Sequence, residues 1–154
     1  MPNWYSNTLT ITEGEPSVVF DAIQTEHWLF DFNTLIPKPR EIADAYHWSI
    51  QNWGTKWNSA YARHSATSPH NTIHFDTAWA PPVPVFEALA ERFPEHEFTI
   101  RSLDEYMLFH YKFLLKDGEL FWRNEPCVLL DDPALTPEGL RQLSATFGAE
   151  EAIE

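Results

Sequence analysis

The 154-residue sequence has little of several residue types, and each scarcity excludes a class of protein. Cys127 is the only cysteine, which excludes an intramolecular disulfide and a zinc site built on several cysteines. With five glycines, phosphate-cradling loops are scarce, and no Walker, dinucleotide-binding or HExxH motif occurs. No apolar run approaches the roughly 20 residues that span a bilayer, so we expect no membrane partner.

Positive charge is scarce as well. Ten Lys and Arg residues stand against 23 Asp and Glu residues, which gives a formal net charge of -13. Such a charge disfavours direct nucleic-acid binding and docking on anionic membranes. It fits a soluble protein, a protein with a basic partner, or a mimic of nucleic acid. No basic N-terminal region followed by an apolar segment is present, so we expect a cytoplasmic protein.

Aromatic residues are plentiful at 15%, seven of them Trp, which indicates a folded domain rather than a disordered chain. Alternation of apolar and polar residues predicts strands at four ranges: 7–12, 59–64, 72–79 and 97–101. Helical spacing of apolar residues predicts one helix from Pro16 to about Glu26 and another between Pro84 and Pro94. An Asp117-Gly118 turn predicts a β-hairpin over residues 107–123.

This order of elements predicts an α+β fold of the ferredoxin-like split βαβ type (βαββαβ). A long Trp-rich insertion follows the first helix, and a C-terminal β-hairpin plus a short terminal helix complete the chain. We expect a ferredoxin-like domain over 1–125 and an acidic C-terminal extension with that short helix over 126–154. The strand residues expected to face the helices are Leu9, Ile11, Ile73, Phe75, Phe98 and Ile100. Those expected on the opposite face are Thr8, Thr10, His74, Asp76 and Arg101.

Four stretches make the sequence recognisable: MPNWYSN (Met1–Asn7), DFNTLIPKP (Asp31–Pro39), NWGTKWN (Asn52–Asn58) and FDTAWAPPVP (Phe75–Pro84). In this order they resemble the YubB-like family, a ferredoxin-like domain found in bacteriophage and conjugative-plasmid proteins. The resemblance implies the fold and a mobile-element setting but no reaction. Tyr5 stands where the family often has Cys, so a thiol role there is excluded. The family's Gly-containing turn after the fourth strand is also missing, since residues 102–106 read Ser-Leu-Asp-Glu-Tyr.

The NWGTKWN stretch is the strongest candidate site. Two Trp rings could stack on a ligand, Lys56 could bind its anionic group, and Asn amides could orient it. The residues grouped in this candidate ligand site are Asn3, Trp4, Asn52, Trp53, Lys56, Trp57, Asn58, Asp76 and Trp79. The alternative is a folding role, in which Trp53 and Trp57 plug the core and the Asn side chains cap backbone groups.

The leading hypothesis is a non-catalytic module of a mobile element that binds a small ligand or a host protein, with no cofactor. The open edge or face of the sheet could also form the contact of a homodimer, because unpaired strands readily pair with a second copy. A second hypothesis is an acidic mimic that occupies a host DNA-binding protein through Asp131, Asp132, Glu150 and Glu151. A third is an enzyme centred on Lys56 and Asp76. His74, Asp76 and His110 offer a two-His, one-carboxylate set, but their spacing does not predict a metal site.

Overall fold

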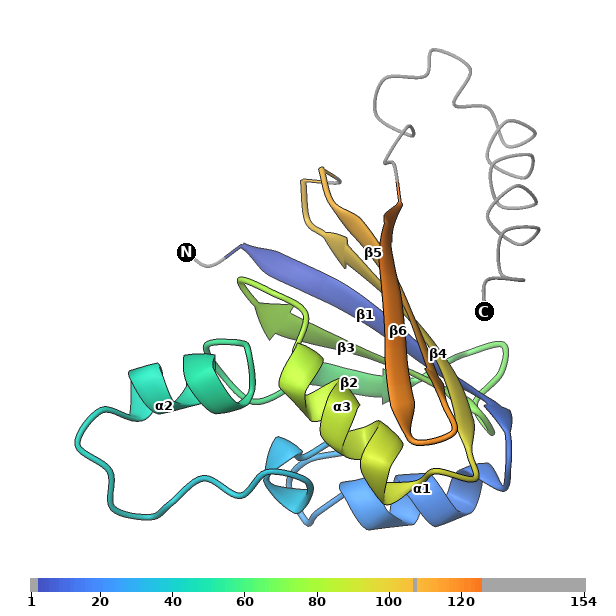
Figure 1. The fold of residues 1–154 in the computed structure, drawn as a ribbon, viewed down its shortest axis with the longest axis horizontal. Coiled ribbons are helices and arrows are strands. Elements are labelled where there is room, and N and C mark those ends of the chain that lie inside the picture. Colours follow the sequence, from blue (N-terminus) through green and yellow to red (C-terminus); the bar gives the residue numbers. More distant parts are fainter. Residues whose placement is uncertain (1–2, 107, 126–154) are drawn as a thin grey trace.

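The computed structural model describes residues 3–106 and 108–125, which form one antiparallel sheet with three α-helices and a 3-10 helix (Figure 1). In chain order the elements are β1 (Trp4–Glu13), α1 (Pro16–Ile23), the 3-10 helix η1 (Phe32–Thr34), α2 (Ala45–Asn52), β2 (Ala60–His64), β3 (Thr72–Ala78), α3 (Val83–Arg92), β4 (Glu97–Asp104), β5 (His110–Lys116) and β6 (Glu119–Glu125). The α+β class predicted from the sequence is confirmed. The expected terminal helix lies outside the described residues.

The six strands lie in the order β2-β3-β1-β4-β5-β6, and every neighbouring pair is antiparallel. The central strand β1 is long because both of its neighbours pair with it along nearly its whole length. Strands β2 and β6 form the two edges of the sheet. In β2 the register shifts between Ala60 and Arg63, and Tyr61 has a φ of 54°, so this edge is bulged.

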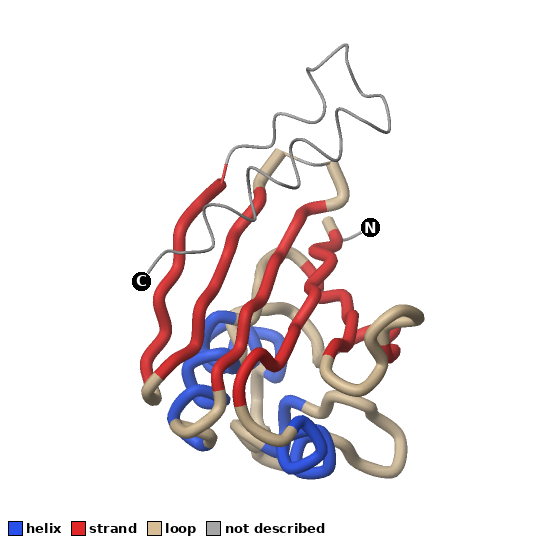
Figure 2. The backbone as a smooth tube through the Cα atoms, turned by 90° about the vertical axis from the view of Figure 1, so that its right-hand side faces the viewer, coloured by secondary structure: helices blue, strands red, loops and turns tan. Residues whose placement is uncertain are grey.

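The core lies on the face of the sheet that α1 and α3 cover. All six strand residues expected to face the helices are buried, which confirms the predicted alternation. Helix α1 adds Val19 and Ile23 to the same cluster, and α3 adds Phe86 and Leu89. Each such side chain stabilises the fold by about 1.5–3 kcal/mol through burial. Figures 1 and 2 show the helices gathered at one end of the strands, so the other ends of β4, β5 and β6 extend beyond them.

Several boundaries differ from the sequence prediction. Strand β1 begins at Trp4 rather than at Asn7. Helix α1 ends at Ile23 rather than near Glu26, because the Ile23 carbonyl accepts the backbone N–H of Asp31 and the chain turns away. Strand β4 continues past Arg101 to Asp104, since its pairing with both neighbours continues. Strand β3 stops before Trp79, whose φ of 80° ends the extended backbone.

The predicted hairpin is confirmed, with Lys116 paired to Glu119 across a two-residue turn. Asp117 and Gly118 have φ values of 55° and 77°, the positive angles that a type I′ turn requires. Its first strand begins at His110, later than residue 107, because the Asp104 carboxylate accepts the N–H groups of the two preceding residues and holds them in a turn. Within the described part of the chain, no helix is long and apolar enough to cross a membrane.

Candidate functional site

The connection between α1 and β2 contains most of the predicted site, and one carboxylate organises it. Asp31 is 8% exposed. Its Oδ1 accepts hydrogen bonds from the Asn58 amide (2.9 Å) and from the backbone and side chain of Asn33 (2.9 and 3.0 Å). Its Oδ2 accepts one from the Thr25 hydroxyl (3.0 Å). Burial raises the pKa of Asp31, but these hydrogen bonds outweigh it and hold the pKa below its ordinary value.

Asn58 completes what we call the Asp31–Asn58 clasp. While its amide donates to Asp31, its Oδ1 accepts the backbone N–H groups of Phe32 (2.9 Å) and Ser59 (2.8 Å). The Ser59 hydroxyl donates to the Phe30 carbonyl. The clasp therefore ties the DFNTLIPKP stretch to the NWGTKWN stretch. For Asn58 the structure favours the folding role over ligand contact, because both polar atoms of its amide are used within the fold.

Trp53 lies in the core and is 2% exposed. Its indole Nε1 donates to the Ile36 carbonyl (2.9 Å), and its ring packs edge-on against Phe32 and Trp48. Lys38 Nζ lies 5.1 Å above the same ring and donates to the Ser49 hydroxyl. For Trp53 the structure therefore favours the role in core packing over a position in the wall of a ligand pocket.

The residues beside Trp53 also serve the fold. The Asn52 amide donates to the Trp48 carbonyl one helical turn back. Gly54 has a φ of 78°, and a Cβ there would lie 2.6 Å from Pro84 Cδ at the start of α3. The buried Thr55 hydroxyl donates to the Ala78 carbonyl at the end of β3 (2.6 Å). Together these contacts fix the backbone that leads into the next residue, Lys56.

Lys56 is surrounded by aromatic rings. Its Nζ lies 4.6 Å from the ring centroid of Trp57, 4.7 Å from that of Trp79 and 5.8 Å from that of Tyr46. These are cation–π distances, at which ring faces attract an ammonium group. All three rings are exposed, by 45%, 42% and 44% respectively. The positive φ of Trp79 turns its side chain beside Lys56 and Tyr46, and its N–H is held by the Asn3 carbonyl (2.7 Å).

The aromatic surface continues from Trp57 toward the edge strand β2. Trp4 on β1 lies against Trp57 (ring centroids 5.8 Å apart) and against Tyr61 on β2 (5.9 Å). A groove of about 500 Å³ begins at Trp57 and runs along β2, with Trp28 and Tyr61 among its walls. We call Trp4, Tyr46, Lys56, Trp57, Tyr61 and Trp79 the Lys56 aromatic surface.

The predicted pairing of Lys56 with Asp76 is not formed. Asp76 lies on the sheet face away from the helices, where its carboxylate accepts a long hydrogen bond from the Ser6 hydroxyl (3.4 Å). Burial raises the pKa of Asp76, and the positive charge of Arg63 and the Ser6 bond only partly oppose this rise. Since the ammonium of Lys56 lies between rings, no lysine–carboxylate pair is available to the proposed enzyme site.

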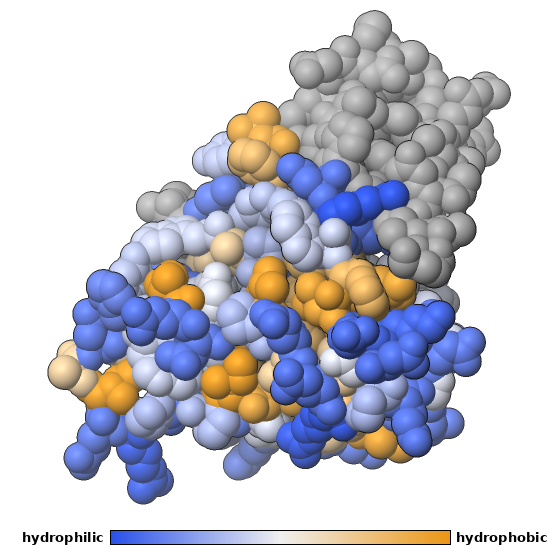
Figure 3. All heavy atoms as spheres, in the orientation of Figure 1, coloured by the Kyte–Doolittle hydropathy of each residue, from blue (hydrophilic) through white to orange (hydrophobic). Residues whose placement is uncertain are grey.

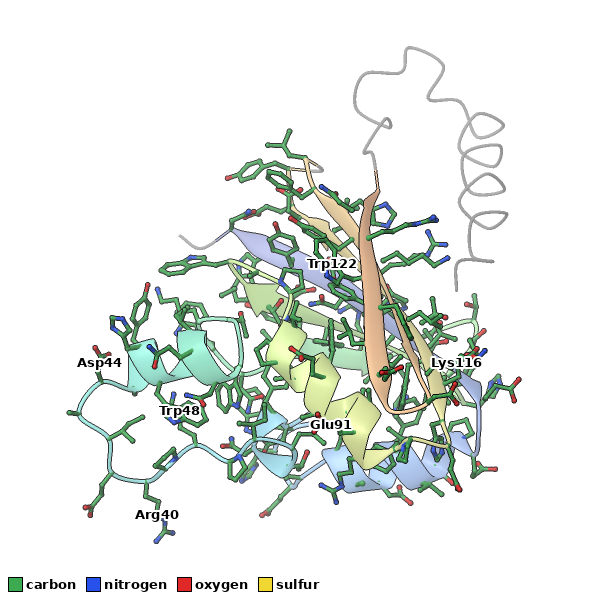
Figure 4. All side chains as sticks on the ribbon, in the orientation of Figure 1. Arg40, Asp44, Trp48, Glu91, Lys116 and Trp122 are labelled. Carbon is green, nitrogen blue, oxygen red and sulfur yellow. The ribbon has the colours of Figure 1, made fainter. Side chains whose placement is uncertain are left out.

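A second hollow, of about 410 Å³, lies on the helix-bearing face, where Figure 3 shows hydrophobic residues in the middle and hydrophilic ones toward the rim. Its walls are Gly54, Ala80, Pro81, Val83, Pro84, Tyr111, Phe113 and Trp122, none of them charged. Figure 4 labels Trp122 on β6. Over residues 3–106 and 108–125, no three His, Cys, Asp or Glu side chains gather as metal ligands would.

Tyr46 and Tyr61 were not predicted from the sequence as members of the candidate site. Tyr46 lies on α2, one residue after a helix start capped by Asp44, and nothing in the local pattern places that helix beside Trp79. Tyr61 could have been noticed as an exposed aromatic of an edge strand, but its position against Trp4 depends on the bulge in β2.

Comparison with known proteins supports the fold. Residues 52–121 match a family model described as a ferredoxin-like domain in Api92-like protein. This stretch includes NWGTKWN, β2 through β5 and the start of β6. Neither the curated proteins nor the solved structures gave a significant match. The YubB-like name and the phage or plasmid setting stay predictions.

Proposed function

We propose that this protein is a non-catalytic binding module of a mobile genetic element, and that the Lys56 aromatic surface holds a small ligand with a planar ring and an anionic group. The observation that carries the proposal is the Lys56 ammonium, held between two exposed indole rings. The mobile-element setting rests on the sequence resemblance alone. We also propose the split βαβ topology, which the β2-β3-β1-β4 order supports, extended by β5 and β6.

The chemistry of the surface is that of a recognition site for a flat anion. Exposed Trp and Tyr rings supply stacking area at low cost in side-chain entropy. The ammonium supplies the attraction for a phosphate or a carboxylate, and its packing against rings fixes its position before a ligand arrives. The groove along β2 continues from Trp57 and is large enough for a ring system.

The arrangement does not favour catalysis. A general acid or base needs a proton-transfer group within hydrogen-bond reach of a reacting atom. The residues that surround Lys56 Nζ are aromatic, and Asp76 is not among its partners. For these residues, positioning and stacking are the chemistry that the geometry supports.

The test uses three probes that separate the ring from the anion: adenosine monophosphate, adenosine and ribose 5-phosphate. Indole N–H signals in an NMR titration report which Trp residues respond. We expect adenosine monophosphate to shift the signals of Trp57 and Trp79 and to leave that of Trp53 in place. Adenosine and ribose 5-phosphate should each bind more weakly, because each lacks one of the two recognised groups.

The matched variants are Lys56→Met, which keeps an apolar stem, and Lys116→Met, which removes a remote lysine on β5 (labelled in Figure 4). We expect Lys56→Met to weaken binding of adenosine monophosphate about tenfold, equivalent to about 1.4 kcal/mol. Lys116→Met should bind as the wild type does. Equal binding by wild type and Lys56→Met, or no response of Trp57 and Trp79 to any probe at millimolar concentration, contradicts the proposal.

A further inference from the structure

The two edge strands of the sheet differ in regularity. At β2 the register shifts and Tyr61 has a positive φ, and a bulge of this kind is one way in which proteins block pairing of an edge with another chain. Strand β6 is regular, since Glu119–Glu125 pair with β5 without a shift in register. A regular edge strand can accept a further strand, so we examine β6 as a contact surface.

The outer side of β6 presents backbone hydrogen-bonding groups. Lys116 and Glu119 flank the two-residue turn, and such a flanking pair is hydrogen-bonded across the hairpin. Hydrogen-bonded and non-hydrogen-bonded pairs alternate along an antiparallel ladder. The backbone N–H and C=O groups of Leu120, Trp122 and Asn124 therefore point away from β5, where a second strand would meet them as a row of donors and acceptors.

Two large apolar side chains on β6 are exposed, one on each face of the sheet. Phe121 is 41% exposed and Trp122 is 61% exposed. They point to opposite faces because successive side chains of a strand alternate. Trp122, labelled in Figure 4, packs against Tyr111 of β5 and forms one wall of the 410 Å³ hollow. Adjoining exposed aromatic residues on a regular edge are typical of a surface that a partner covers.

The charge of this hairpin permits a second copy of the chain as that partner. The whole chain has a formal net charge of -13, which opposes self-association in general. The hairpin 110–125 is balanced, because its three basic residues, Lys112, Lys116 and Arg123, match its three acidic residues, Asp117, Glu119 and Glu125. Two copies can therefore approach through β6 without local repulsion of net charge.

Two-fold symmetry and charge restrict the register of such a pairing. When two copies of one strand pair antiparallel about a two-fold axis, one residue lies opposite its own copy. A pairing centred on Trp122 sets the acidic residues 119 and 125 opposite each other, and one centred on Arg123 sets two arginines opposite each other. Like charges directly opposite one another destabilise a sheet, so both registers are disfavoured.

The register centred on Phe121 avoids these clashes over residues 119–123. It sets Glu119 opposite Arg123, whose guanidinium has five donors and can meet this carboxylate while it keeps its own contacts. It sets Leu120 opposite Trp122 on the helix-bearing face, beside the hollow. On the other face the two copies of Phe121 meet, and aromatic cross-strand pairs are stabilising.

We propose that two copies of this chain pair antiparallel through β6, centred on Phe121, and form a dimer with one continuous sheet of twelve strands. The proposal does not depend on the Lys56 aromatic surface, which includes Tyr61 on the opposite edge strand β2. Because β2 and β6 are the two edges of each sheet, the dimer carries one such surface at each end, roughly 50 Å apart at the usual strand spacing.

The test is sedimentation equilibrium on the full chain, in which the dimer has twice the 17.9 kDa mass of the monomer. We expect the wild type to dimerise as its concentration rises. Phe121→Lys and Phe121→Glu each set like charges opposite one another at the two-fold axis, so each variant alone should self-associate at least about tenfold more weakly. An equimolar mixture of the two variants should recover the dimer, because opposite charges then meet at the axis.

Val18→Lys and Val18→Glu are the matched controls, since Val18 is an exposed apolar residue on α1. Both should dimerise as the wild type does, and thermal melts check that every variant is folded. The register is tested by oxidation in a Cys127→Ser background. Phe121→Cys should form a covalent dimer, because residues opposite one another at a non-hydrogen-bonded position have Cα atoms about 4.5 Å apart. Trp122→Cys should cross-link more slowly.

Four results overturn the proposal. The first is a wild type that stays monomeric up to about 1 mM, where even weak association is detected. The second is a dimer that both Phe121 variants form as well as the wild type does. The third is a mixture of these two variants that associates no better than either alone. The fourth is faster cross-linking at residue 122 than at residue 121.

Discussion

Removal of the Asp31 carboxylate is the most direct test of the view that the Trp-rich connection is held by a clasp. In Asp31→Ala the Asn58 amide loses its acceptor, and so do both N–H groups of Asn33 and the Thr25 hydroxyl. A buried donor left unpaired costs about 1–3 kcal/mol. Asn33 and Thr25 are exposed, so water can replace their bonds, whereas Asn58 is half-buried.

Counting the Asn58 amide fully and the others only in part, we expect a loss of about 2–3 kcal/mol in the free energy of unfolding. For a domain of this size that corresponds to a fall of roughly 5–12 °C in Tm. Asp31→Asn, which keeps one acceptor oxygen, should lose about half as much. Asp21→Ala is the matched control, since Asp21 is an exposed carboxylate on α1.

The same variant makes a prediction about pH. The pKa of Asp31 is lower in the folded state, so its contribution to stability is present above the unfolded pKa of about 3.9 and is lost as pH falls through the folded pKa. Thermal melts of wild type and Asp31→Ala should therefore differ most at neutral pH and converge in acid. A Tm for Asp31→Ala that matches Asp21→Ala at pH 7, or a gap unchanged at pH 3, would refute the clasp.

Three further predictions are checked by thermal melts. Gly54→Ala should lower the free energy of unfolding by about 2–4 kcal/mol, because a Cβ there would lie 2.6 Å from the Pro84 ring of α3. Gly118 has a similar φ but more space around it, so Gly118→Ala should lower the free energy of unfolding by only about 1 kcal/mol. Equal losses in the two variants would contradict the contact between Gly54 and Pro84. Trp53→Phe should lower the free energy of unfolding by about 2–3 kcal/mol, because it removes the indole hydrogen bond and part of the core packing. Trp57→Phe should lower it by less than about 0.5 kcal/mol, because Trp57 is exposed. The reverse order would show that Trp57, not Trp53, is the residue that packs in the core. The pKa of Asp76 is raised in the folded state, so the protonated form is favoured and the free energy of unfolding falls as pH rises through that pKa. The Tm of Asp76→Asn should therefore match or exceed that of the wild type at pH 7, and any advantage should disappear below about pH 4, near the unfolded pKa. A lower Tm for Asp76→Asn at pH 7 contradicts this.

Local patterns predicted much of the fold because local physics decides it. Alternation in β1 and β3 identified the buried side of each strand, and the Asp117-Gly118 pair identified the turn, since few other residues accept two positive φ angles. The end of α1 was wrong because it depends on a hydrogen bond from Asp31, which lies eight residues further along the chain.

The candidate site was harder to predict than the fold. Two of its four indole residues, Trp53 and Trp57, look alike in sequence, yet one is 2% exposed and the other 45%. The chain turns between them at Gly54, whose φ is 78°, and Trp53 packs in the core while Trp57 lies at the surface. Tyr46 joined the site only through the placement of α2 beside Trp79, which sequence spacing does not give.

The clasp has a consequence for how this protein can change over evolutionary time or in the hands of an engineer. Because it joins the two ends of the connection, the residues between them form a closed loop. The far part of this loop, residues 39–43, is mostly exposed, and Figure 4 shows Arg40 pointing outward there. The entropy cost of a longer loop grows slowly, by about 0.6 kcal/mol for each doubling of its length. Residues 39–43 are therefore a natural insertion point, where a peptide tag or a new recognition loop can be added while the sheet remains undisturbed.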